Sequence, residues 1–264
     1  MKKTFPTELV YHVFSLLIAF IVVHSIYVTL VRPQARDFIK QETANILADP
    51  QYVPERSFYV VIKDYEQETC FVLMLWAFSI LAYKGRDAYR QQKLLGQDLL
   101  QLPGSLPIGP EDTREIAKHV AALPGHLQDW LLPRALLTAI ERFGATRNVQ
   151  DVSTAARGVC ESEGERMESE LSIIRYIAWA IPSVGFIGTV RGIGDALGQA
   201  HRAVEGDITG VTSSLGVAFN STFIALVISI ILMFFIHQLQ LMQERLVLDS
   251  ERYVDSWLIR RLRS

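Results

Sequence analysis

A stretch of 23 residues near the start of the chain, Leu9–Val31, contains no Asp, Glu, Lys or Arg. At 1.5 Å per residue, a helix of this length crosses the hydrocarbon core of a bilayer, which is about 30 Å thick. The stretch is too long for the apolar part of a signal peptide and has no small-residue cleavage site, so we expect it to be retained. We therefore interpret the chain as a membrane protein.

Three further apolar segments follow, at about residues 69–83, 171–193 and 214–237. The first of them is short for a span, so it either crosses a locally thinned bilayer or extends helically back through Ser57–Glu68. No strand-like alternation of any length is present. The predicted fold is all-α: a polytopic membrane protein with four transmembrane helices and long helices extending into the cytoplasm.

The spans divide the chain into six predicted parts. These are an N-terminal head with the first transmembrane helix (1–31), a periplasmic loop (32–68), a second transmembrane helix (69–83), a cytoplasmic helical domain (84–170), paired pore-lining transmembrane helices (171–237) and a cytoplasmic amphipathic C-terminal helix (238–264). We expect Pro33, Pro50 and Pro54 to interrupt the loop. Lys and Arg gather after the second span and in the tail, which predicts that both termini are cytoplasmic.

Within the cytoplasmic part, Asp112 and Glu115 resemble a capping box and predict a helix through Leu123. Pro133 is suited to begin another helix, which we expect Gly144 to terminate. From about residue 149 the pattern is helical and highly charged, and it continues without a strong breaker into the third span. We therefore expect a long helix that projects from the membrane. Its charged face is either solvated or a contact surface for another protein.

The third and fourth spans carry small residues where leucine is usual in a membrane helix. Helical spacing places four of these on one stripe of the third span: Pro182, Gly185, Thr189 and Gly192. Five share a face of the fourth span: Ser214, Ala218, Thr222, Ala225 and Ser229. The spacing of Gly185, Gly188 and Gly192 predicts a place where helices approach closely. Two such faces with hydroxyl groups indicate a narrow, partly polar passage.

No signature of a soluble enzyme is present: we find no P-loop, no nucleophile elbow and no Cys/His cluster with metal spacing. The chain is therefore predicted not to be an enzyme and to need no cofactor or metal. Its net charge of −2 argues against binding to nucleic acid. Cys70 and Cys160 are expected on opposite sides of the membrane, so we predict no disulfide between them.

The motif GFIGTVRGI (185–193), followed about thirty residues later by LGVAFNSTFIALV (215–227), resembles the paired pore helices of the MotA/TolQ/ExbB proton-channel family. The resemblance is specific over roughly Glu165–Gln240. It implies that Thr189 and Thr222 line an ion pathway, where hydroxyls both donate and accept hydrogen bonds and so pass on water or hydronium. The alternative is a packing role, since a membrane threonine commonly bonds to the carbonyl four residues before it.

Two features depart from parts of this family. ExbB-like and TolQ-like members carry a glutamate five positions before the second threonine, and Val217 stands there in this chain. Asn220 lies two residues before Thr222, on another side of the helix, and we expect it to face a neighbouring helix. Four spans resemble the MotA arrangement, whereas ExbB and TolQ relatives have three.

The resemblance implies a ring-forming subunit of an ion-motive-force-driven motor in the bacterial inner membrane, a homopentamer acting as a stator. Its partner is expected to be a single-span protein of the ExbD/TolR/MotB type with a membrane aspartate. Protons or sodium would flow at the interface between the two. The alternative is a non-conducting membrane scaffold or receptor subunit. The load stays open between import, envelope maintenance, motility, export and defence.

His12 and His24 lie within the first predicted span. They either face another helix or the interface as neutral imidazoles, or they take part in a proton relay.

Overall fold

The computed structural model describes residues 7–49, 52, 55, 57–100 and 107–263. It is 86% helical, and the described residues form no β-strand. Four helices are long and apolar enough to cross a membrane: Leu9–Ile46, Tyr65–Leu94, Val149–Gly198 and Thr209–Arg261. The predicted all-α fold with four membrane-length helices is therefore confirmed. The predicted breaks at Pro50 and Pro54 lie outside the described residues.

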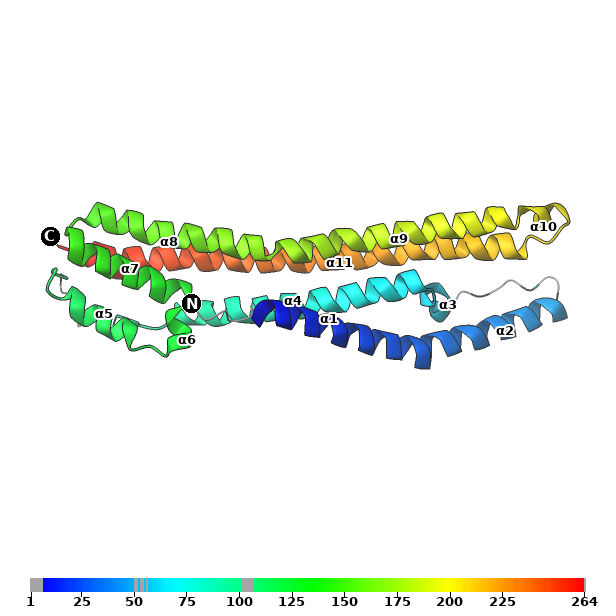
Figure 1. Cartoon of the computed structure of the whole chain (residues 1–264), viewed down its shortest axis with the longest axis horizontal. Coiled ribbons are helices and arrows are strands. Elements are labelled where there is room, and N and C mark those ends of the chain that lie inside the picture. Colours follow the sequence, from blue (N-terminus) through cyan, green and yellow to red (C-terminus); the bar gives the residue numbers. More distant parts are fainter. Residues whose placement is uncertain (1–6, 50–51, 53–54, 56, 101–106, 264) are drawn as a thin grey trace. The chain divides into compact units, whose positions relative to one another are not determined.

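The chain divides into two compact units. The first takes in the chain up to Leu81 and Ile173–Ile236, and the second takes in Ala82–Ser172 and His237–Ser264. Figure 1 shows the order of the helices along the chain. Long helices, α4 (Tyr65–Leu94) and α11 (Thr209–Tyr253), continue from one unit into the other.

The first helix does not end at Pro33. α1 (Thr7–Ile26) continues through a π-helical turn (Tyr27–Val31) into α2 (Arg32–Ala48). Proline is tolerated because it occupies the first turn of α2, where its missing N–H removes no helical bond, and the π-turn absorbs the change of register. The expectation that Pro33 interrupts the chain is wrong.

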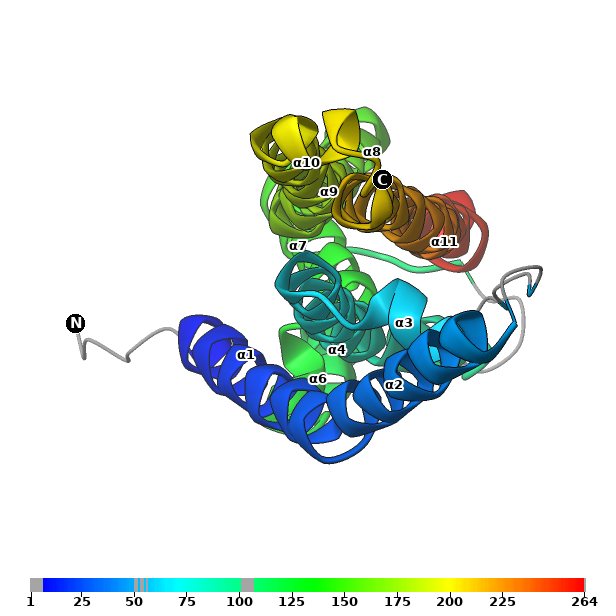
Figure 2. The ribbon, with the colours of Figure 1, turned by 90° about the vertical axis from the view of Figure 1, so that its right-hand side faces the viewer.

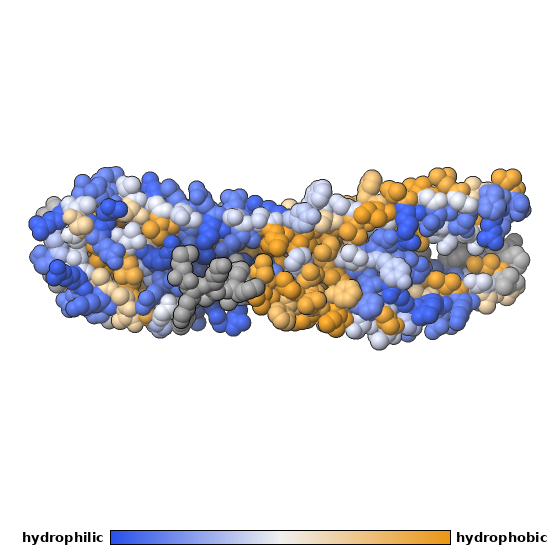
Figure 3. Space-filling model, in the orientation of Figure 1, coloured by the Kyte–Doolittle hydropathy of each residue, from blue (hydrophilic) through white to orange (hydrophobic). Residues whose placement is uncertain are grey.

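α1 packs against α4 through polar anchors that satisfy backbone carbonyls. Trp76 Nε1 donates to His12 O at 3.0 Å, and Tyr11 Oη donates to Ser79 O at 2.9 Å. The other faces of α1 expose large apolar side chains, and Figure 3 shows hydrophobic surface gathered over this helix. Such a surface suits contact with lipid.

The second membrane helix begins earlier than its apolar stretch. A short helix, α3 (Phe58–Ile62), precedes α4, which starts at Tyr65. Because α4 has 30 residues, it reaches the length of a span by extending back into polar sequence. The predicted alternative of helical extension therefore holds back to Tyr65 only, because Lys63 and Asp64 are not helical and separate α4 from α3.

The second unit has a hydrophobic core built by α5 (Thr113–Ala121), α7 (Leu131–Thr146), α8 (Val149–Glu170) and the end of the chain. The short helix α6 (Gly125–Gln128) joins α5 to α7. Beyond α11, a π-helical turn (Val254–Leu258) and a 3₁₀ turn (Ile259–Arg261) complete the core. Leu239, Leu246 and Tyr253 are buried on one face of α11, as expected for an amphipathic helix.

Two predicted helix ends differ in this unit. The Asp112 side chain accepts from Gly109 N at 2.8 Å and does not cap α5. α7 continues past Gly144 and ends at Thr146, with Arg147 in the left-handed conformation at φ 54°. A Cβ on Gly144 would lie 3.2 Å from Thr113 Oγ1, so this glycine serves the approach of α5 to α7.

The charged helix predicted before the third span is present as α8, whose N-terminus is capped by Asn148 Oδ1 accepting from Gln150 N at 2.9 Å. A single turn at Leu171 joins it to α9 (Ser172–Gly198). Helix α10 (Ala200–Val204) then leads to α11.

Cys160 lies in the core of the second unit, and Cys70 lies in the first, and both thiols are free. Burial raises the pKa of the Cys160 thiol to about 11, and nearby glutamates add to this effect. A rise of this size lowers the reactive thiolate fraction at neutral pH by about 100-fold.

We expect Cys160 to resist alkylation by iodoacetamide at pH 7.5 until the protein is unfolded, as measured by peptide mass spectrometry. Modification in the native protein as fast as in urea would contradict the burial.

Candidate functional site

α9 and α11 form an antiparallel pair along the first unit, side by side in both views of the ribbon (Figures 1 and 2). Contacts run from Gly192 against Ser214 to Ser229 Oγ, which donates to Ala178 O at 3.1 Å. Within the first unit, α4 lies beside this pair and α1 lies on the far side of α4 (Figure 2).

The glycines of α9 are the points of closest approach. A Cβ on Gly185 would lie 2.5 Å from Ala225 Cβ, and one on Gly192 would lie 2.8 Å from Ala218 Cβ. A Cβ on Gly188 would lie 2.5 Å from Ser221 Cβ. Real Cβ atoms do not approach this closely, so only glycine permits this packing. The structure therefore brings all three predicted glycines to one contact, which is made within a single chain.

Thr189 and Thr222 meet at the centre of this contact. Their hydroxyl oxygens lie within hydrogen-bond distance of each other. Thr189 Oγ1 also contacts Ala218 O at 3.1 Å, and Thr222 Oγ1 contacts Gly185 O at 3.2 Å. Each threonine thus reaches the carbonyl that lies four residues before the other threonine.

These hydrogen bonds to the opposite helix help to decide whether the two threonines serve only in packing. Thr189 Oγ1 also lies 3.3 Å from Gly185 O, four residues before it, as a packing threonine does. Thr222 bonds instead across the helix contact. Two hydroxyl protons face two carbonyls and each other, so more than one donor arrangement satisfies the same atoms.

The other predicted residues occupy varied positions. Ala218 and Ala225 are completely buried, and Ser229 faces α9. Pro182 lines an open groove on α9 with Phe186, and so it departs from the predicted stripe. Asn220 is half-buried on α11. The buried face of α9 follows the glycines: Ala178, Ile181, Gly185, Gly188, Gly192 and Ala196.

Two consecutive polar residues of α4, Glu66 and Gln67, were not anticipated as part of the site, and the next residue, Glu68, contacts α1 and α2 instead. Glu66 accepts a bidentate pair from Arg191 of α9, with Nε–Oε1 at 2.7 Å and Nη2–Oε2 at 2.8 Å. Gln67 is completely buried, and its Nε2 donates to Ser221 Oγ of α11 at 3.3 Å. Glu68 binds Arg32 of α2.

Sequence reasoning placed these residues in an outer loop because their polarity ends the apolar stretch at residue 69. The missed signal is that three polar side chains in direct succession on a helix point in three directions. Each of these side chains therefore needs its own partner where it is withdrawn from water.

The histidines of α1 differ in their surroundings. His24 Nδ1 lies 2.7 Å from Glu68 Oε1, so this ring contacts a neighbouring helix. The carbonyl of His12 accepts from Trp76. Contact with Glu68 agrees with either interpretation of His24, as a helix contact or as part of a relay.

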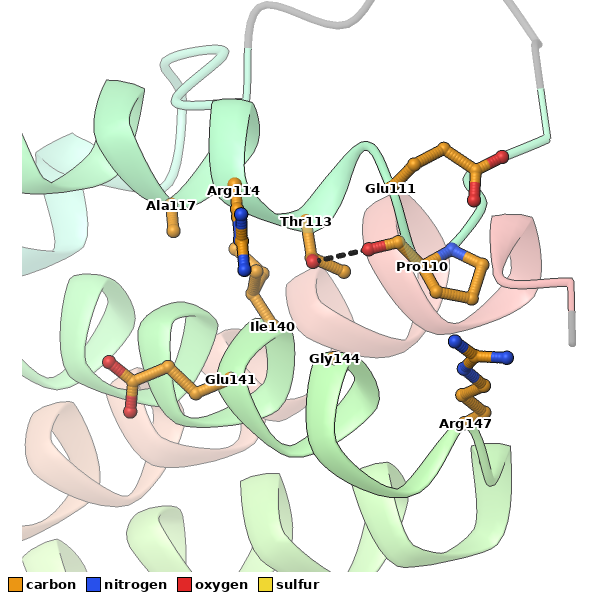
Figure 4. Close-up of a pocket in the computed structure, with 9 residues that line it drawn as sticks. All are labelled: Pro110, Glu111, Thr113, Arg114, Ala117, Ile140, Glu141, Gly144 and Arg147. Atoms are coloured by element: carbon orange, nitrogen blue, oxygen red, sulfur yellow. Dashed lines mark hydrogen bonds between the residues drawn. The ribbon is translucent and has the colours of Figure 1, made fainter.

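The second unit contains a cavity of about 590 Å³ between α5 and α7 (Figure 4). Its wall carries two acids, Glu111 and Glu141, and two bases, Arg114 and Arg147, whose charges balance. Thr113 Oγ1 in the wall donates to Pro110 O at 2.6 Å. Across the described ranges, no group of three or more His, Cys, Asp or Glu side chains is placed to hold a metal ion.

The model of the MotA/TolQ/ExbB proton channel family matches residues 129–252. This region includes the threonine pair, the glycine contact and the charged helix α8. Comparison with curated proteins gave no match, and neither did comparison with solved structures. The predicted resemblance to this family is therefore confirmed over residues 129–252. Together with the four membrane-length helices, this match places the protein in a membrane.

We expect Gly188→Ala to destabilise the first unit by about 1–3 kcal/mol, because the added carbon overlaps Ser221. Gly194→Ala is the matched control, since it lies on the same helix and a Cβ there meets nothing within 4 Å. Alanine favours helix over glycine, so the control should keep or raise the melting temperature. Thermal unfolding in detergent, followed by circular dichroism, measures both. Equal melting temperatures for the two variants would contradict the close contact.

Proposed function

We propose that this chain is the ring-forming subunit of an ion-motive-force-driven motor in the bacterial inner membrane. It would conduct protons at its interface with a partner of the ExbD/TolR/MotB type and convert ion flow into mechanical work. The family match supports a proton-channel membrane protein. The single observation that carries the proposal is the meeting of the Thr189 and Thr222 hydroxyls between two membrane helices.

The chemistry of this pair suits ion transfer. A hydroxyl accepts and donates hydrogen bonds without a fixed charge that would trap a passing cation. The carbonyls of Gly185 and Ala218 supply further acceptors on the same side of the contact. Water or hydronium arriving at the pair would therefore find several equivalent partners.

A titratable group must come from elsewhere in this account. The two acids in the first turn of α4 are engaged, Glu66 by Arg191 and Glu68 by Arg32. A group that binds and releases a proton midway across a bilayer usually marks the pathway. We infer that a membrane aspartate of a single-span partner supplies it beside the threonines. Protons are the favoured ion, with sodium as the other candidate.

The outward face of α9 supports assembly with other chains. It exposes large apolar side chains, among them Phe186, Ile187 and Val190, which line an open groove with Arg191. By analogy with the family, we propose a homopentameric ring around the partner's spans. The arginine-rich tail supports a cytoplasmic position for both termini.

The alternative is a non-conducting scaffold or receptor subunit. The contact of Thr189 Oγ1 with Gly185 O favours it, because this bond is typical of a threonine that only packs. Under this alternative the hydroxyls serve assembly and no ion passes.

Thr189→Val and Thr222→Val separate the two functions. Each change keeps the side-chain volume and removes the hydroxyl, so we expect the chain to assemble with its partner while ion-driven activity falls at least about tenfold, through loss of hydrogen bonds made in the pathway. The measurement compares co-purification of the partner with the cellular activity that depends on it. Ser229→Ala is the control, because it removes an α11 hydroxyl that bonds to α9 away from the pair. Full activity in both valine variants would support the scaffold.

A further inference from the structure

One turn of α4 reaches three other helices of the first unit. Successive helical residues point about 100° apart, so neighbours in sequence face different partners. Glu66 binds Arg191 of α9, Gln67 binds Ser221 of α11, and Glu68 binds Arg32 of α2.

Two of these contacts adjoin the threonine pair directly. Ser221 precedes Thr222, and Arg191 lies two residues beyond Thr189. The Cγ of Glu66 lies 3.1 Å from the place a Cβ on Gly188 would take, beside Ser221 Cβ. The missing side chain of Gly188 therefore makes the space in which α4, α9 and α11 meet.

We propose that Glu66 and Gln67 are positioning residues that set the rotation of α9 and α11 about their axes, and so aim the Thr189 and Thr222 hydroxyls at each other. The role of that aim in ion transfer rests on the proposed function. Ser221 Oγ donates to Val217 O at 2.9 Å while it accepts from Gln67, so its hydroxyl is fixed from both sides. Arg191 is fixed by two parallel bonds, a geometry that resists rotation of α9.

For Gln67, a positioning role can be distinguished from a contribution to thermal stability. Its side chain is fully buried. Its Nε2 donates to Ser221 Oγ and, at 3.2 Å, to Val61 O of α3, whereas its Oε1 accepts no hydrogen bond from the described part of the chain. A buried amide that is only partly bonded gains little stability over an apolar residue of similar size. Gln67→Met should therefore leave the melting temperature unchanged or higher while it disturbs the pair.

The test uses the full chain with Thr189→Cys and Thr222→Cys, because side chains whose γ atoms touch are suited to form a disulfide. Disulfide formation is driven with copper phenanthroline, and its rate is measured by mass spectrometry of the linked peptides. This linking rate reports how well the side chains at positions 189 and 222 are oriented toward each other. We expect Gln67→Met and Ser221→Ala each to slow linking by about fivefold, and their combination to add nothing further.

The ion pair between Glu66 and Arg191 can be tested by exchanging the two charges. Glu66→Arg and Arg191→Glu should each slow linking, and the double reversal should restore it. Glu68→Gln is the matched control: it lies on the same turn but faces α1 and α2, so linking should keep the parent rate. If a reversed single variant does not fold, Glu66→Gln and Arg191→Gln test whether loss of the ion pair slows linking.

Parent linking rates in the Gln67 and Glu66 variants would overturn the proposal. Equal slowing by Glu68→Gln, or failure of the double reversal to rescue, would also overturn it, because either result indicates general loosening. Linking is measured without ion flux. Its outcome therefore stays distinct from a failure of the proposed function, which would appear as full activity in the valine variants.

Discussion

The close contact between α9 and α11 is the constraint on which the site depends. In lipid, apolar burial does not drive helices together, so small residues that permit close packing carry the association. Gly185, Gly188 and Gly192 leave no side chain between the backbones, and the opposing Ala218 and Ala225 are completely buried. A larger residue at any of these positions would separate the helices.

That separation would have a chemical consequence. Thr189 and Thr222 reach each other, and each reaches a carbonyl of the opposite helix, only because the backbones lie so close. Two residues beyond Thr189, the charge of Arg191 is neutralised at short range by Glu66. The centre of the pair is thus polar but uncharged. In the proposed motor, this leaves room for a charge supplied by the partner.

Local patterns predicted much of this structure. The glycine spacing predicted the close approach, and the apolar stretches predicted four membrane helices, because both depend on the helical period alone. The helix continues through Pro33 because of a π-helical turn, and the spacing of residues in the sequence does not predict such a turn. The polar start of α4 was predicted only as one of two alternatives, because Glu66, Gln67 and Glu68 are tolerated in the bundle only through partners on three other helices. Such partners lie far away in sequence. The same holds for Thr113, whose close approach accounts for a glycine at position 144 inside α7. The role of the threonines in ion transfer stays a prediction.

The central claim is that this subunit provides an uncharged passage and that the proton-binding group comes from a partner. Proton flux into liposomes under an imposed gradient, followed with an internal pH-sensitive dye, tests it most directly. The purified chain alone should give no flux above empty vesicles. The chain with its partner should conduct, and replacing the partner's membrane aspartate with asparagine should abolish the flux. Robust flux through the subunit by itself would contradict the account.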